Sequence, residues 1–169
     1  MTHVKLLVIV TSDRERRRLL EAWRERLVGP HRLTPEAALL GAQAPSGPVS
    51  FGRIDVREGL SLYLFIADGG WRREYVCQVL ASQVAGYCLI VGPEPGDLTL
   101  GRDLLALLRA TTDGPGIVAA TDAQDPEATR AALALPLDLP LARVDCGRGP
   151  SADDLVCGLL EHLAAVPAA

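Results

Sequence analysis

The residues best placed for chemistry follow an apolar stretch in the first half of the chain. Residues 60–67 are almost entirely apolar, and Asp68, Gly69 and Gly70 come directly after them. An apolar run of this length predicts a strand that is covered on both faces, and the two glycines predict a sharp turn beyond its end. In open α/β sheets, ligands bind outside the carboxyl ends of the strands. The turn at Asp68, Gly69 and Gly70 is therefore the place where a ligand of such a sheet would lie.

A second candidate is formed by three consecutive arginines, Arg16, Arg17 and Arg18. They follow the apolar residues 4–10 and lie near the start of a predicted helix, where free backbone amides attract anions. However, Ser12 and Glu15 fit a capping box, and Asp13 adds negative charge to the first turn. We therefore expect these amides to be satisfied internally. The arginines have two interpretations, which are an anion site and a solvated basic helix face.

The remaining reactive side chains form no recognisable catalytic arrangement. The three histidines are far apart in the chain, and no serine or cysteine lies in a G-x-S-x-G segment. Cys77, Cys88, Cys146 and Cys157 lack the paired spacing of a metal site. We expect four buried free thiols and no bound metal.

The composition is that of one compact domain spanning residues 1–169. Hydrophobic residues make up 49% of the chain and charged residues 22%, which is typical of a globular protein. The net charge of −4 gives no reason to expect a nucleic-acid partner. The apolar run at the start is too short for a signal peptide, and no stretch reaches the roughly 18 apolar residues of a membrane span. We expect a cytoplasmic protein.

Strand-like and helix-like segments alternate along the chain. The strand-like segments are residues 4–10, 49–56, 60–67, 86–91, 117–120 and 139–144. The helix-like segments are residues 14–27, 72–83, 98–109, 126–135 and 151–165, and residues 29–47 are predicted to be irregular. Residues 49–67 read as an antiparallel hairpin. The order predicts an α/β fold with a six-stranded, mostly parallel sheet, one antiparallel strand and helices on both faces.

This order, with the hairpin in second place, resembles the Ras-like small GTPases, which have a P-loop NTPase fold. The segments FGRI, LSLYLF, AALALPLDLPLARVDC and LLEHL resemble bacterial Ras-like proteins of the "ATP/GTP-binding protein" type, which are related to the gliding-motility GTPases. Such proteins commonly accompany roadblock-type partners. The likeness runs from Lys5 to Leu163, but it does not extend to the nucleotide motifs.

The phosphate-binding loop of that family needs the pattern G-x-x-x-x-G-K-[ST]. Its glycines let backbone amides wrap the phosphates, its lysine reaches the terminal phosphates, and its hydroxyl holds magnesium. Aligned without gaps, this place holds VTSDRERR at residues 10–17. Val10 and Glu15 replace the glycines, while Arg16 and Arg17 replace the lysine and the hydroxyl. We expect the phosphate site to be closed.

The base-reading motif N-K-x-D cannot occur anywhere in this chain, because the chain has no asparagine and Lys5 is its only lysine. The place expected for the motif holds Thr121, Asp122, Ala123 and Gln124. Gln124 stands where a carboxylate would accept hydrogen bonds from guanine, and Asp122 would serve only after a shift of one residue. Asp125 is expected to cap the next helix.

The segment that carries out hydrolysis in Ras-like GTPases also lacks its catalytic residue type in this chain. Gly69 matches the glycine that would sense the terminal phosphate, but Gly70 stands where a glutamine would orient the attacking water. Ser46 is the best match to the threonine expected before the hairpin. Asp145, Cys146 and Gly147 retain little of the last base-contact loop.

These losses together predict a pseudo-GTPase, a regulatory module that has lost nucleotide binding and hydrolysis and therefore has no cofactor and no enzymatic activity. Trp71, Arg72 and Arg73 follow the glycines, at the place where Ras-like proteins meet their regulators. Tryptophan and arginine are enriched in interface hot spots, so we expect a protein partner there, and the resemblance implies one of the roadblock type. The other interpretation is that Trp71 joins the core and the arginines are solvated.

Two alternatives remain open from the sequence. The first is a GTP-binding protein with magnesium and weak GTPase activity that holds phosphate through Arg16, Arg17 and Arg18. The second is a receiver-like domain that is phosphorylated on Asp68. A receiver needs an acidic pair after its first strand and a late lysine, for which this chain offers only Asp13 and Lys5.

Overall fold

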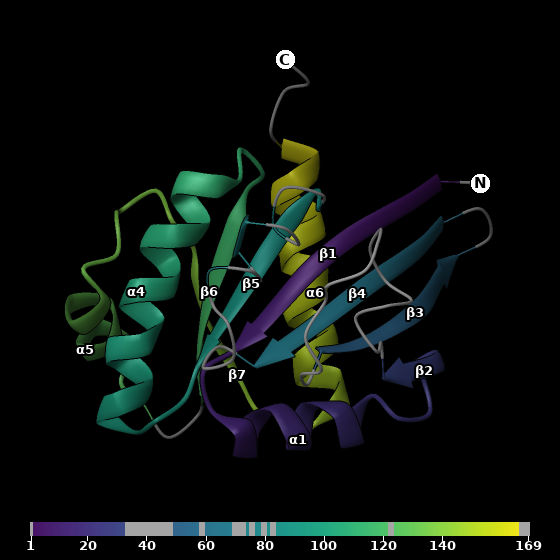
Figure 1. The fold of residues 1–169 in the computed structure, drawn as a ribbon, viewed down its shortest axis with the longest axis horizontal. Coiled ribbons are helices and arrows are strands. Elements are labelled where there is room, and N and C mark those ends of the chain that lie inside the picture. Colours follow the sequence, from purple (N-terminus) through teal and green to yellow (C-terminus); the bar gives the residue numbers. More distant parts are fainter. Residues whose placement is uncertain are drawn as a thin grey trace.

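The computed structural model describes residues 2–32, 49–57, 60–68, 84–121 and 124–165, together with residues 74, 77, 78 and 81. Its strands are β1 (Thr2–Val10), β2 (Val28–Arg32), β3 (Val49–Arg57), β4 (Leu60–Asp68), β5 (Gly86–Val91), β6 (Gly116–Thr121) and β7 (Leu141–Val144). Its helices are α1 (Asp13–Ala22), α4 (Pro95–Thr111), α5 (Pro126–Leu133) and α6 (Gly149–Ala165) (Figure 1). Most of the predicted helix at residues 72–83 lies outside the described residues.

The strands form a single mixed sheet in the order β2-β3-β4-β1-β5-β6-β7. β3 is antiparallel to both of its neighbours, and the other neighbouring strands pair in parallel. This confirms the predicted fold class, and all six predicted strands are present. The structure adds β2 at one edge, at the start of the segment that was expected to be irregular. Gly29 and Pro30 are unfavourable in strands, so the sequence did not predict β2. Proline lacks an N–H to donate, but it is tolerated in an edge strand, where one side of the backbone needs no partner strand.

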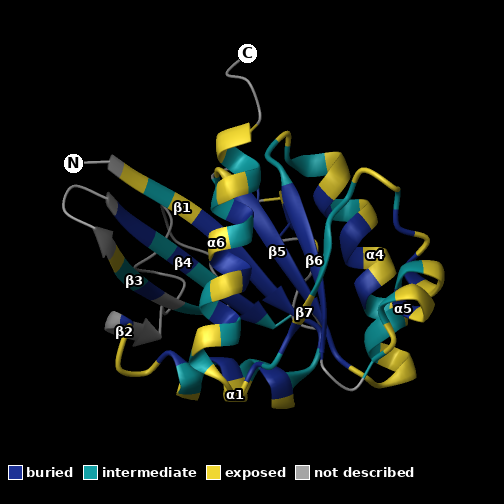
Figure 2. Ribbon diagram, turned by 180° about the vertical axis from the view of Figure 1, so that it is seen from behind, coloured by how far each residue is buried: buried dark blue, intermediate teal, exposed yellow. Residues whose placement is uncertain are grey.

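Helices cover both faces of the sheet (Figure 2). The side chains of β1 alternate between the two faces, and all of those from Leu6 to Val10 are buried. Leu6, Val8 and Val10 pack with residues of α1 and α6, while Leu7 and Ile9 pack with residues of α4. β1 therefore has a hydrophobic core on each side, as expected for a central strand.

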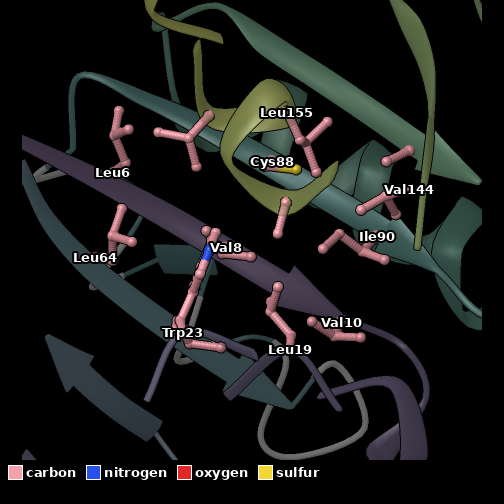
Figure 3. Close-up of a cluster of buried hydrophobic side chains, with 14 of the residues drawn as sticks. Leu6, Val8, Val10, Leu19, Trp23, Leu64, Cys88, Ile90, Val144 and Leu155 are labelled. Carbon is pink, nitrogen blue, oxygen red and sulfur yellow. The ribbon is translucent and has the colours of Figure 1, made fainter. Parts of the chain in front are cut away.

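Trp23 anchors α1 to the sheet (Figure 3). Its side chain is 1% exposed and lies in the cluster that contains Leu19, Val8 and Leu64. Its Nε1 donates a hydrogen bond to Asp153 Oδ1 of α6 at 3.2 Å, which satisfies the polar atom that a buried indole carries.

The helix that carries Trp23 is shorter than the sequence predicts. α1 ends at Ala22 rather than at residue 27, and Trp23 is its C-cap. Leu27 is nevertheless buried, because the turn after α1 places its side chain against Gly52 of β3. Leu27 fits the spacing of the helical apolar face by coincidence.

Two helix starts follow clear capping signals. Asp125 caps α5 by accepting hydrogen bonds from the amides of Glu127 and Ala128, both at 3.3 Å, and Pro126 occupies the first turn. This confirms the predicted role of Asp125. α4 begins at Pro95, earlier than predicted, where Glu94 and Asp97 form a capping box. No helix in the described part of the chain is long and apolar enough to cross a membrane.

The cysteines follow the expected pattern with one exception. Cys77, Cys88 and Cys146 are buried free thiols, whereas Cys157 is free and exposed. The prediction of burial is wrong for Cys157, because α6 meets the core through Ala152, Leu155, Val156 and Leu159. Burial raises the pKa of Cys77 to about 11 and the pKa of Cys146 to about 12. Burial also raises the pKa of Cys88.

We expect Cys157 to be the only thiol of the folded protein that reacts rapidly with a disulfide reagent at neutral pH, because the other three thiols are buried and keep their protons. In denaturant all four thiols should react. The measurement is the absorbance of the released thiolate with and without urea, and Cys157→Ser should remove the rapid phase. Rapid reaction of a second thiol in the folded state would contradict the packing of the core.

Candidate functional site at the carboxyl ends of the central strands

The candidate site residues predicted from the sequence gather along one edge of the sheet. Val10 is the last residue of β1 and pairs in register with Asp68, the last residue of β4. Thr121 ends β6, and Asp145 follows β7. In Figure 1 the arrowheads of β1 and β4 point to the edge of the sheet beside α1. This is where ligands bind in open α/β sheets.

The connection from β1 to α1 contains only two residues, Thr11 and Ser12. Thr11 is 7% exposed, and its backbone N–H donates to the carbonyl oxygen of Ile90 at 3.0 Å. Its Oγ1 accepts a hydrogen bond from Gly92 N–H at 2.9 Å. The chain therefore stays against β5 and then enters the helix directly. A phosphate-binding loop needs a longer segment whose amides surround the anion, and here residues 13–17 form the first turns of α1 instead.

The charged side chains in the first turns of α1 pair with one another. Ser12 Oγ accepts from Glu15 N–H at 3.5 Å, as expected of the N-cap. The carboxylate of Asp13 pairs with Arg16 at 2.9 Å and also with Arg17, rather than with the helix amides. The hydrogen bond from Arg16 lowers the pKa of Asp13. These ion pairs give the arginines carboxylate partners within their own helix.

Arg18 links α1 to the loop after β7. Its Nη1 donates to both oxygens of Glu15, at 3.2 and 2.9 Å, and its Nη2 donates to Asp145 Oδ1 at 2.9 Å. The Glu15 side chain is 5% exposed, while that of Arg18 is 43% exposed. The guanidinium lies over Gly147, where an added Cβ would be 2.7 Å from Nη2. A side chain at this position would make the Arg18 guanidinium move aside. The hydrogen bond that Arg18 donates to Glu15 raises the pKa of Arg18.

Gln124 links the loops after β5 and β6. Its Oε1 accepts from the N–H and the Oγ1 of Thr121, at 3.0 and 3.1 Å, and its Nε2 donates to the carbonyl oxygen of Gly92 at 3.0 Å. Both ends of the amide are thus used within the fold. The side chain that stands at the place of a base-reading carboxylate is directed toward the neighbouring strand end.

The carboxylate of Asp97 in α4 lies against Gly92. Its Oδ2 accepts from the backbone N–H of Glu94 at 3.2 Å. A Cβ added to Gly92 would lie 2.6 Å from Ser12 Cβ and would also collide with the Asp97 carboxylate. The backbone after β5 can approach the β1–α1 connection only because residue 92 is glycine. Desolvation raises the pKa of Asp97.

We call three of these contacts the edge bridges: Gly92 to Thr11, Gln124 to Gly92, and Arg18 to Asp145. Together they connect the residues that follow β1, β5, β6 and β7. The polar groups that form them are hydrogen-bonded within the fold. Within the described ranges, no group of three or more His, Cys, Asp or Glu side chains could hold a metal ion. The chemistry that the arrangement supports is cross-linking of the sheet edge.

The sequence did not indicate Thr11, Gly92 or Asp97 as members of this site. A glycine followed by a proline directly after a buried strand, as at Gly92 and Pro93, was the one available signal of a close backbone approach. Gly69, Gly70, Trp71, Arg72, Arg73 and Asp122, which were predicted site residues, lie outside the described residues, as does Ser46. The antiparallel β3 differs from the all-parallel sheet of a receiver.

Comparison with known proteins supports the fold. No protein-family model matches the chain, and no curated protein matches it. Among solved structures the chain is similar to a bacterial selenocysteine-specific elongation factor, EF-Sec, with a TM-score of 0.61 and 18% sequence identity. The likeness covers 96% of this chain and 29% of that chain. At this identity it shows the fold alone, which is a GTPase-like α/β fold consistent with the P-loop type.

Arg18→Met should lower the free energy of unfolding by about 1–3 kcal/mol, because it leaves the buried Glu15 carboxylate without its charged partner. The matched control is Arg24→Met, which removes a pair with Glu21 in which both side chains are 74% exposed. That change should stay within about 0.5 kcal/mol. Urea unfolding measures both variants. Equal effects would show that the Glu15–Arg18 pair is no stronger than a surface pair.

The difference in the free energy of unfolding between the Asp97→Asn variant and the wild type should grow in favour of the variant as the pH rises from below 3.8 to neutrality. Desolvation raises the folded-state pKa of Asp97 above the reference value of 3.8. The folded state therefore holds this proton more tightly than the unfolded state, and losing the proton costs stability as the pH rises. Asparagine has no such cost, and its Oδ1 can still accept from Glu94 N–H. Urea midpoints across this range measure the difference, and a constant or opposite trend would count against the desolvated site.

Proposed function

We propose that this chain is a pseudo-GTPase, a GTPase-like domain that has lost nucleotide binding and works by binding a protein partner. The observation that carries the proposal is the two-residue connection between β1 and α1. A phosphate-binding loop presents several consecutive amides to the anion. Thr11 and Ser12 cannot form such a loop, because the Thr11 N–H donates to Ile90 and Ser12 is the helix cap.

The electrostatics of the helix start support the same conclusion. The N-terminus of α1 would attract an anion through its dipole, but Asp13 and Glu15 place two carboxylates in its first turn. Arg16, Arg17 and Arg18 pair with these carboxylates. A phosphate at this position would therefore compete with carboxylates that are already in place.

The edge bridges support a fold that is complete without a ligand. A nucleotide at this edge would contact the loops that follow β1, β6 and β7. Here Arg18 connects α1 to the loop after β7, and Gln124 connects the loops after β5 and β6. Side chains of the protein thus supply connections that a bound nucleotide would otherwise make.

The proposed role follows because these connections are made by the protein itself and do not depend on a bound nucleotide. A domain without a terminal phosphate has no ligand that shifts it between two conformations, so its binding surface is always present. We place the partner at Trp71, Arg72 and Arg73, on the basis of their residue types and their position after β4. A roadblock-type protein is the partner that the resemblance to bacterial Ras-like proteins suggests.

The test is nucleotide binding by the purified full chain. With a micromolar Kd, about a thousandfold excess of nucleotide over Kd would raise the free energy of unfolding by about 4 kcal/mol. We expect no shift of the thermal midpoint with GDP, GTP or ATP in the presence of magnesium, and no binding of fluorescent derivatives. Micromolar binding of any of them would overturn the proposal.

Phosphate release distinguishes the alternative of weak GTP hydrolysis. We expect release from the wild type to equal the blank, and the double variant Arg16→Ala with Arg17→Ala to behave identically. Release above the blank that disappears in the double variant would establish the alternative instead, because only that alternative assigns these arginines a contact with phosphate.

A further inference from the structure

A small cavity lies among residues of α6, β3, β4 and the turn after α1, and we call it the α6 cavity. Its volume is about 210 Å³. Four aliphatic side chains and one thiol line it, namely Ile54, Leu62, Val156, Leu160 and Cys157. None of its lining residues takes part in the edge bridges, so it is a candidate site separate from the sheet edge.

The aliphatic lining belongs to the core on the α6 side of the sheet. Ile54 of β3 and Leu62 of β4 are paired in register, and Val156 and Leu160 lie one turn apart on α6. Leu62 and Val156 are buried members of this core, while Ile54 and Leu160 are partly buried against it. Cys157 is exposed. The cavity is therefore apolar inside, with the thiol on its solvent side.

The charged side chains that line the cavity are paired within the protein. Asp55 pairs with Arg53 at 3.2 Å, and Asp153 pairs with Arg26. The second oxygen of Asp153 accepts a hydrogen bond from Trp23 Nε1 at 3.2 Å. Two carboxylates are thus balanced by two guanidinium groups. Among the described lining residues, the cavity offers no free counter-ion to a charged ligand.

The walls of the cavity are tied to one another. The ion pair of Arg26 with Asp153 joins the turn after α1 to α6. The pairing of Ile54 with Leu62 joins β3 to β4. Collapse of the space would strain these contacts, because protein interiors are close-packed and transmit strain. The cavity is therefore largely preformed, as ligand sites usually are.

The volume of the cavity indicates the size of its ligand. An engineered apolar cavity of about 150 Å³ in another protein stays dry and binds benzene. Pockets for drug-sized molecules have volumes of about 300–1,000 Å³. The α6 cavity, at about 210 Å³, lies between these two sizes.

We propose that the α6 cavity binds a small, uncharged, apolar molecule of about the size of a substituted benzene ring. Burial among the aliphatic side chains removes the apolar surface of the ligand from water. A charged molecule of the same size is rejected, because it would lose its hydration without gaining a counter-ion. The proposal goes beyond the proposed function and does not depend on it, since the two involve different residues.

The experiment compares three probes of nearly equal size, which are benzyl alcohol, benzoate and benzylammonium. Each is titrated into the full chain labelled at its isoleucine methyl groups, and methyl NMR shifts are recorded. We expect benzyl alcohol to shift the Ile54 signal in a saturable manner and to leave Ile9, which packs on the other face of the sheet, unchanged. The two charged probes should bind at least about tenfold more weakly.

A variant that fills the cavity mouth tests the location independently. Cys157→Trp should weaken the binding of benzyl alcohol at least about tenfold, because the indole would occupy the space. The matched control is Ala132→Trp on α5, which places the same side chain at another exposed position and should leave binding unchanged. Thermal unfolding shows whether each variant is folded, and the comparison of the three probes needs no variant.

Four results would each overturn the proposal. They are the absence of a saturable shift at Ile54, equal binding of the charged probes, unchanged binding by folded Cys157→Trp, and equal shifts at Ile54 and Ile9, which would show unspecific association. An Ile54 signal that moves with protein concentration when no probe is present would also overturn it, because the cavity would then be covered by a second copy of the chain. Nucleotide titration tests the sheet edge separately.

Discussion

The hydrogen bond from Gly92 N–H to Thr11 Oγ1, at 2.9 Å, holds the start of α1 against the end of β5. It fixes the chain where a parallel sheet leaves its strand ends open to solvent and ligands. Because Gly92 has no side chain, Ser12 and the Asp97 carboxylate can both approach it closely. The helix then begins only two residues after the strand. The arrangement of the whole edge follows from this short path.

The short path also determines where the charges of α1 lie. Starting the helix at Asp13 brings Glu15 into a buried position with 5% of its side chain exposed. A buried carboxylate requires a partner, and Arg18, one turn later, supplies it. The other half of the same guanidinium reaches Asp145, so the pairing that neutralises Glu15 also ties α1 to the far side of the sheet edge. The contacts of Arg18 with Glu15 and Asp145 therefore both stabilise the fold and close this edge of the sheet.

The fold could be predicted from the sequence because its signals are local. Apolar runs and the caps at Ser12 and Asp125 identify strands and helices without knowledge of the rest of the chain. β2 was missed because a short edge strand containing Gly29 and Pro30 depends on pairing with β3, which local patterns do not reveal. The exposure of Cys157 also depends on which face of α6 meets the sheet.

The site could be predicted only in part. The residue types at the nucleotide motifs indicated which groups are missing, and their positions at the strand ends followed from the parallel order. What replaces those groups could not be read from the sequence. Arg18 and Asp145 are 127 positions apart, and Gln124 reaches Gly92 across 32 positions. Such contacts depend on the packed sheet, and no spacing rule connects them.

Analysis of what the purified protein carries tests the central claim most directly, namely that side chains of this chain occupy the place of a nucleotide. The full chain would be purified without added nucleotide and denatured in acid, and the released small molecules would be separated by ion exchange and quantified by ultraviolet absorbance. We expect no purine nucleotide above the level of the buffer. Close to one guanine nucleotide per chain would contradict the claim, because the edge that we describe as closed would then have held a ligand.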